Sequence, residues 1–197
     1  MASSKSGRRL ARRKAFELLF ELGQHPGLDA TRILSRSFDD SDVLEVYCLD
    51  EDADGYVVLP VKRSGDGGPT RLAPSAEPIR QFVSELVTAV TSYTAQIDAE
   101  LSKYPEDWSY ERIGTAERIL LQLAVAEMVY LGTSYKVVID EILDIAKLYA
   151  QEDATRFING ILGAVVRNLA ALKQSSSVEA ATFREQASKL RADQASK

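Results

Sequence analysis

The feature that most constrains the fold is a helical spacing of apolar residues that runs from residue 79 to residue 169. Within it, apolar side chains recur at intervals of three and four, which places them on one face of a helix. Four such stripes predict four helices, over residues 79–101, 113–128, 138–149 and 157–169. Amphipathic helices in series bury their apolar faces against one another, so the sequence predicts an all-α fold.

Two further helices are predicted upstream, over about residues 7–22 and 29–38. Together with the later helices they predict one helical domain, built from residues 1–38 and 76–172. The remaining residues, 173–197, form a polar C-terminal tail, for which a frayed helix and a disordered segment both remain open.

An acidic insertion is predicted over residues 39–75. It carries eight acidic and no basic residues between Asp39 and Gly55. Runs of β-branched and aromatic residues flank Asp54-Gly55, which predicts a small β-hairpin with its turn there, followed by a loop over residues 64–69.

The composition excludes several classes of site. The chain has 197 residues, a net charge of −5, one histidine (His25) and one cysteine (Cys48). It therefore lacks the residues for an internal disulfide or a Cys/His metal cluster. It also has no glycine-rich phosphate loop, no nucleophile motif, and no apolar run long enough for a membrane span or a secretory signal. We expect a cytoplasmic protein with no catalytic site, metal, cofactor or membrane contact.

A run of cations opposes the acidic average at the N-terminus. Six basic residues precede the first acidic one, Glu17: Lys5, Arg8, Arg9, Arg12, Arg13 and Lys14. Cations at a helix N-terminus interact unfavourably with the helix macrodipole, so the cluster destabilises the helix slightly. Binding to the phosphate backbone of a nucleic acid would explain why the cluster is there. The arginines are predicted on the side of the helix opposite or flanking its buried face. RNA or DNA is the predicted partner, and a solvated surface is the alternative. Phe20, further along, fits either a core position or a base-stacking platform.

The second distinctive segment is residues 151–160. Asp153 is predicted to cap the last core helix. Arg156 lies in its first turn, where a cation beside free amides can bind phosphate. Simple capping is the alternative.

These residues, taken in order, resemble the NusB family of transcription antitermination factors. The resemblance covers about residues 7–38 and 76–170, and it rests on five ordered segments: Arg8-Arg9-x-Ala11-Arg12-x-x-Ala15 with Leu19-Phe20, Glu117-Arg118 through Glu127-Met128, Tyr135 to Glu141, Ile145-Ala146-Lys147, and Asp153 through Leu162.

The resemblance implies a pair of packed helical bundles without enzymatic activity. It implies binding to single-stranded boxA-type RNA of ribosomal RNA transcripts, together with the ribosomal protein NusE, to promote elongation by RNA polymerase. The RNA-binding residues that it implies are Arg8, Arg9, Arg12, Arg13, Lys14, Phe20, Asp153, Arg156 and Phe157. Glu117 matches a partner-binding position, and Gln122 stands where many relatives have arginine.

Two other functions remain open. One is an RNA-substrate-binding module related to the N-terminal domain of RNA cytosine methyltransferases. The other is a protein-interaction module without RNA contact. The sequence also leaves open whether the chain forms a homodimer.

Overall fold

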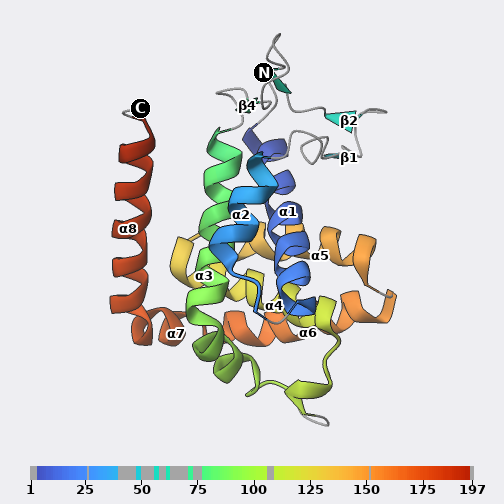
Figure 1. Cartoon of the computed structure of the whole chain (residues 1–197). Helices are drawn as coiled ribbons and strands as arrows, with labels where there is room; N and C mark the ends of the chain where they lie inside the picture. The colour runs from blue at the N-terminus through green and yellow to red at the C-terminus, as the bar shows by residue number, and fades with distance from the viewer. Residues whose placement is uncertain are drawn as a thin grey trace. The chain divides into compact units, whose positions relative to one another are not determined.

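The computed structural model describes residues 4–25, 27–39, 48–49, 56–57, 61–62, 71–72, 77–105, 109–150 and 152–195. The chain divides into two compact units, residues 1–84 and 85–197. Helices make up most of the described part of both units (Figure 1). The prediction of an all-α fold is confirmed.

The first unit is built on α1 (Ser4–Gln24), α2 (Ala30–Asp39) and the beginning of α3 (Glu77–Leu101). α1 and α2 contact each other (Figure 1). α2 begins where the sequence predicts, because the Asp29 side chain accepts a hydrogen bond from the backbone N–H of Thr31 at 3.2 Å and caps the helix. The apolar face of α1 is buried along its length, from Leu10 to Leu19.

Among the residues described between α2 and α3 are four short strands. β1 (Cys48–Leu49) pairs antiparallel with β2 (Tyr56–Val57), and these are the two arms of the predicted hairpin. Its turn at Asp54-Gly55 lies outside the described residues. A second antiparallel pair, β3 (Val61–Lys62) with β4 (Arg71–Leu72), brackets the predicted loop and was not expected. The assignment of residues 39–75 as an insertion into the helical domain stays a prediction.

The second unit contains the rest of α3 and a series of further elements. In order these are η3 (Tyr110–Arg112), α4 (Thr115–Ala126), η4 (Glu127–Leu131), α5 (Tyr135–Tyr149), α6 (Glu152–Arg167), α7 (Leu169–Ser175) and α8 (Ser177–Ala195). α4 contacts both α5 and α6, which also contact each other. Every residue of α4 from Ile119 to Ala126 is buried, so α4 is the central helix of this unit.

A change of helix type follows α4. The single predicted helix over 113–128 continues without a break into the π-helical turn η4, which ends at Gly132. Gly132 has φ +78°, a left-handed conformation that glycine adopts without a side-chain clash, and its N–H bonds the carbonyl of Glu127. Glu127 itself is 1% exposed in the middle of this packing.

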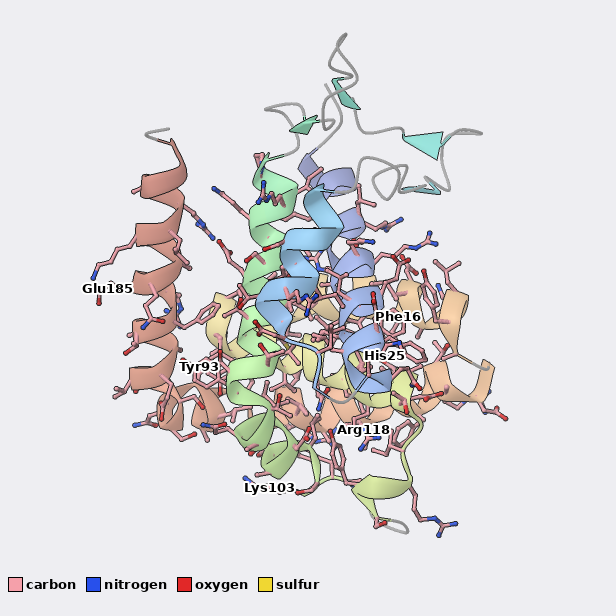
Figure 2. The ribbon with its side chains drawn as sticks, viewed as in Figure 1. Phe16, His25, Tyr93, Lys103, Arg118 and Glu185 are labelled. Carbon is pink, nitrogen blue, oxygen red and sulfur yellow. The ribbon has the colours of Figure 1, made fainter. Side chains whose placement is uncertain are left out.

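The polar C-terminal segment is an ordered helix, α8, in contact with η4. Phe183 is 6% exposed and meets the rings of Tyr93 and Tyr130 edge-on, with centroids 6.1 and 6.5 Å away. Those two tyrosine rings stack at 4.0 Å, and the Tyr93 hydroxyl donates to the backbone carbonyl of Glu179 in α8. Figure 2 shows Tyr93 on α3 and Glu185 on the outward side of α8.

Two arginines complete the attachment of α8. Arg184 Nε donates to the backbone carbonyl of Tyr130 at 3.0 Å, and its Nη2 reaches that of Val129. Arg191 forms a two-bond ion pair with Glu85 on α3, with Nε to Oε1 at 2.6 Å. The sequence left open a frayed helix or a disordered segment for this tail. Residues 177–195 are neither, because they form the helix α8.

Candidate nucleic-acid interface

The cations of α1 differ in how far they reach solvent. Arg8 is exposed, and Arg9 and Arg13 are half-buried. Arg12 is only 2% exposed and Lys14 only 9%. The expectation that the arginines avoid the buried face is therefore wrong at Arg12, because its side chain packs over the ring of Phe82 on α3.

Two kinds of contact hold these cations. The guanidinium carbons of Arg8 and Arg12 lie 5.2 and 5.5 Å from the centroid of the Phe82 ring, in the part of α3 that belongs to the same unit. One turn further along α1, Glu17 accepts Arg13 Nε at 3.2 Å and lies 3.9 Å from Lys14 Nζ. Glu17 therefore offsets part of the charge of Arg13 and Lys14.

Phe20 lies on the same helix and is 37% exposed. Its ring centroid is 6.1 Å from that of the buried Phe16, so the two form a tilted pair of which Phe20 is the outer member. An exposed ring supported from beneath has the form needed to stack on a base. The core reading of Phe20 does not fit this exposure.

The predicted partner-binding residue, Glu117, lies in the second unit. It is half-buried in the first turn of α4, where a carboxylate complements the helix dipole. Its carboxylate folds back over Gly114, since a Cβ built on that glycine would fall 2.2 Å from Glu117 Oε2.

Gln122 is buried in the same helix and is neutral where many relatives are expected to carry arginine. Its side-chain amide donates to Asp98 Oδ1 at 2.7 Å, and the Tyr110 hydroxyl donates to the same oxygen at 2.6 Å. Burial, and then the bond to Asp98, raise the pKa of Tyr110. The side-chain amide of Gln122 is thus already hydrogen-bonded inside the second unit.

The α6 residues lie at the beginning of that helix. Asp153 is exposed and is the second residue of the helix, so its prediction as the cap is wrong: the helix already begins at Glu152. Arg156 is exposed and Phe157 half-buried.

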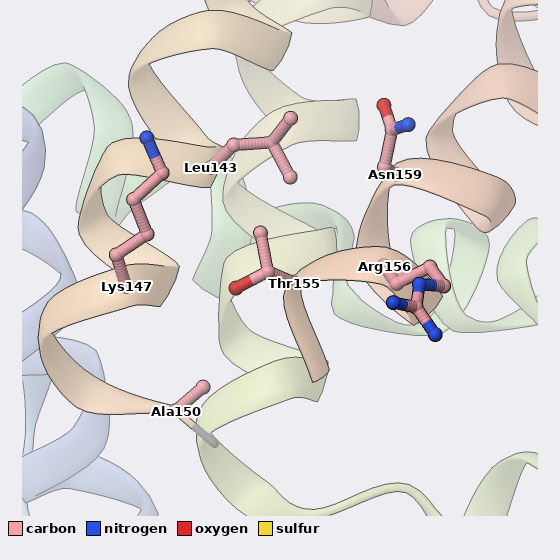
Figure 3. Close-up of a pocket in the computed structure, with 6 residues that line it drawn as sticks. All are labelled: Leu143, Lys147, Ala150, Thr155, Arg156 and Asn159. Carbon is pink, nitrogen blue, oxygen red and sulfur yellow. The ribbon is translucent and has the colours of Figure 1, made fainter. Parts of the chain in front are cut away.

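An open pocket of about 500 Å³ lies between α5 and α6 (Figure 3). It is lined by Leu143, Lys147, Ala150, Thr155, Arg156 and Asn159. Lys147 is 61% exposed at its side chain and pairs with Asp144 at 2.8 Å. Two cations, a hydroxyl and an amide beside a helix N-terminus suit an anionic group such as a phosphate. Of these residues, only Arg156 was predicted from the sequence to bind RNA.

Other kinds of site were sought in the described residues. There, no group of three or more His, Cys, Asp and Glu side chains is placed to hold a metal ion. Within the same residues, none of the helices combines the length and apolar character needed to cross a membrane.

Comparison with known protein families settles the relationship. The NusB family model matches residues 62–167, which is more than half of the chain. The chain belongs to the NusB family. The resemblance seen in the sequence is confirmed, although the match to the NusB model begins after α1 and its arginines.

Relatives of known name agree with this assignment. The transcription antitermination protein NusB of Microcystis aeruginosa is 40% identical over 91 residues, which cover 46% of this chain and 42% of that protein. The NusB protein of Picosynechococcus sp. is 40% identical over 93 residues, covering 47% and 44%. The chain therefore spans less than half the length of these relatives.

Solved NusB structures share the fold. T. maritima NusB matches with a TM-score of 0.59 and 24% identity, over 85% of this chain and 93% of that one. A crystal structure of the antitermination factors NusB and NusE in complex with dsRNA matches with a TM-score of 0.56 and 24% identity, over 82% and 96%. At 24% identity, the similarity to these structures shows a shared fold alone.

Proposed function

We propose that this chain is a non-catalytic transcription antitermination factor that binds RNA through α1. The RNA is of the boxA type found in ribosomal RNA transcripts, and NusE binds alongside it. The complex promotes processive elongation by RNA polymerase in the cytoplasm. Binding alone performs this function, so it requires no cofactor and no reacting group.

The observation that carries the proposal is the exposed Arg8 on a member of the NusB family. A guanidinium in solvent can give a phosphate two parallel hydrogen bonds. Phe20 adds an exposed ring on the same helix, and base stacking on such a ring contributes about 1–3 kcal/mol. The names of the relatives and the RNA in a related NusB–NusE complex support the same function.

Further contacts are proposed in the second unit. Arg156, with Asp153 and Phe157 beside it, offers a second RNA contact at the pocket between α5 and α6. Glu117 offers a carboxylate to NusE. A basic ribosomal protein is a fitting partner for a carboxylate, because opposite charges steer the two proteins together.

Fluorescence anisotropy with labelled RNA tests the proposal. The wild-type chain is titrated into a boxA-type RNA and into a scrambled RNA of equal length, each with and without NusE. Arg8→Ala is the test variant, and Arg112→Ala, at an exposed arginine in η3, is its matched control. Loss of a charged hydrogen bond worth about 1.5 kcal/mol predicts roughly tenfold weaker binding for Arg8→Ala.

The outcomes separate the parts of the proposal. Tighter binding to boxA-type RNA, strengthened by NusE and weakened by Arg8→Ala alone, supports all of it. Equal binding to both RNAs whether or not NusE is present rejects the boxA and NusE parts. Equal losses in Arg8→Ala and Arg112→Ala reject α1 as the specific site.

A further inference from the structure

Two of the arginines of α1, Arg8 and Arg12, converge on one aromatic ring of α3. Arg8 and Arg12 are four residues apart, so they lie on the same side of α1. Both guanidinium carbons lie within 5.5 Å of the Phe82 centroid, the range in which the electron-rich face of a ring attracts a cation. Phe82 is half-buried and otherwise belongs to the apolar stripe of α3.

The two helices approach closely at this point. A Cβ built on Gly7 would lie 3.3 Å from Cγ1 of Ile79, which leaves little room between the first turns of α1 and α3. This contact lies one residue before Arg8 and three residues before Phe82. This close approach brings the Phe82 ring beside Arg8 and Arg12.

The two arginines differ in what they can still reach. Arg12 is 2% exposed, so the folded chain offers almost none of it to an RNA. Arg8 is exposed and touches the same ring. Arg8 can give its outward N–H groups to a phosphate while it keeps its contact with Phe82.

We propose that Phe82 is a positioning residue for RNA binding: it holds the guanidinium of Arg8 toward the RNA, and Arg12 is a buried support and makes no RNA contact. This inference rests on the proposed function. Ordering a free arginine side chain costs conformational entropy. A side chain already held in place by the ring pays less of that cost on binding, and affinity rises accordingly.

Three variants test the role of the ring. Phe82→Leu removes the aromatic face but keeps an apolar side chain, and Phe82→Tyr keeps the face. We expect Phe82→Leu to weaken RNA binding by about two- to fivefold and Phe82→Tyr to remain within about twofold of wild type. Combined with Arg8→Ala, Phe82→Leu should add no further loss, because the ring acts through Arg8.

A second measurement works without RNA. If the ring holds Arg8, its ring current should shift the side-chain Nε–Hε signal of Arg8. We expect NMR of the free protein to show this shift in wild type and Phe82→Tyr but not in Phe82→Leu. Circular dichroism at the titration temperature establishes that each variant is folded. We further expect Arg12→Ala to lower the melting temperature much more than Arg8→Ala does.

The outcomes keep the two proposals apart. If wild type binds no RNA, the proposed function fails, and the NMR shift alone decides whether Phe82 holds Arg8. If Arg8→Ala weakens binding but Phe82→Leu does not, the function stands and the positioning role is rejected. Equal losses in Phe82→Leu and Phe82→Tyr, or additive losses in the double variant, also reject it.

Discussion

The attachment of α8 makes a quantitative prediction at Phe183. Phe183→Ala removes a nearly buried ring from its two edge-on contacts with Tyr93 and Tyr130. Burial of a phenylalanine side chain contributes about 1.5–3 kcal/mol, and each aromatic pair adds about 0.5–1.5 kcal/mol. Arg184 and Arg191 still hold the helix, so we expect α8 to lose about 3 kcal/mol of its local stability without leaving its place.

Hydrogen exchange followed by mass spectrometry measures the local stability of each helix separately. A loss of about 3 kcal/mol corresponds to roughly a hundredfold faster exchange in peptides from residues 177–195. Peptides from α4, which is central to the unit, should keep their wild-type rates. Leu190→Ala is the matched control, because Leu190 is 62% exposed on the same helix. Unchanged exchange of α8 in Phe183→Ala, or an equal effect of Leu190→Ala, would refute the reasoning.

Three further predictions concern single groups. Burial raises the pKa of Glu100, but hydrogen bonds from Lys103 and Tyr104 outweigh this and hold the pKa below its ordinary value. The ionised carboxylate therefore stabilises the fold fully above the ordinary pKa, and this stabilisation is lost as the pH falls through the lowered pKa. Melting curves between about pH 3 and pH 6 should fall less steeply on the acid side for Glu100→Gln, and identical slopes would contradict this. Gly132→Ala should cost about 1 kcal/mol in urea unfolding from backbone conformation alone, since its Cβ would meet nothing within 4 Å; a neutral result would argue against the left-handed turn. Asp98→Ala leaves two buried donors without their acceptor and should cost about 2–4 kcal/mol in the same assay, whereas Asp98→Asn, which keeps an acceptor oxygen, should cost less.

Much of the fold follows from the spacing of apolar residues. The stripe that begins at Ile79 predicts α3, and the stripe over 138–149 predicts α5, because each helix buries one face. A glycine at position 132 suits the end of the helical segment that begins with α4, since glycine alone adopts a left-handed φ without cost. The π-helical turn before it does not follow, because nothing in the apolar spacing distinguishes i→i+5 from i→i+4 bonding.

The C-terminal helix shows where composition misleads. Residues 177–195 are polar, and composition therefore favours fraying or disorder. One phenylalanine and two arginines anchor the segment instead, through partners 53 to 106 positions away in the sequence. Contacts at such separations leave no local pattern in the chain.

In the candidate site, too, some residues could be predicted from the sequence and others could not. The arginine run at a helix N-terminus and Phe20 further along the same helix are visible in the sequence, and Arg8 and Phe20 are exposed as such a site requires. The burial of Arg12 and the role of Phe82 were not visible, because the ring reaches α1 from a different helix. Lys147, too, joins Arg156 only through the packing of α5 against α6.

The mode by which Arg184 holds α8 has an evolutionary consequence. Its guanidinium binds the backbone carbonyls of Val129 and Tyr130, and a carbonyl is present whatever side chain stands there. Position 129 can therefore drift among apolar residues without losing this anchor. Among homologues that carry an equivalent of α8, the arginine should be kept with no matching change at position 129. Phe183 and its two tyrosines should instead vary together, because the shape of each ring limits the others.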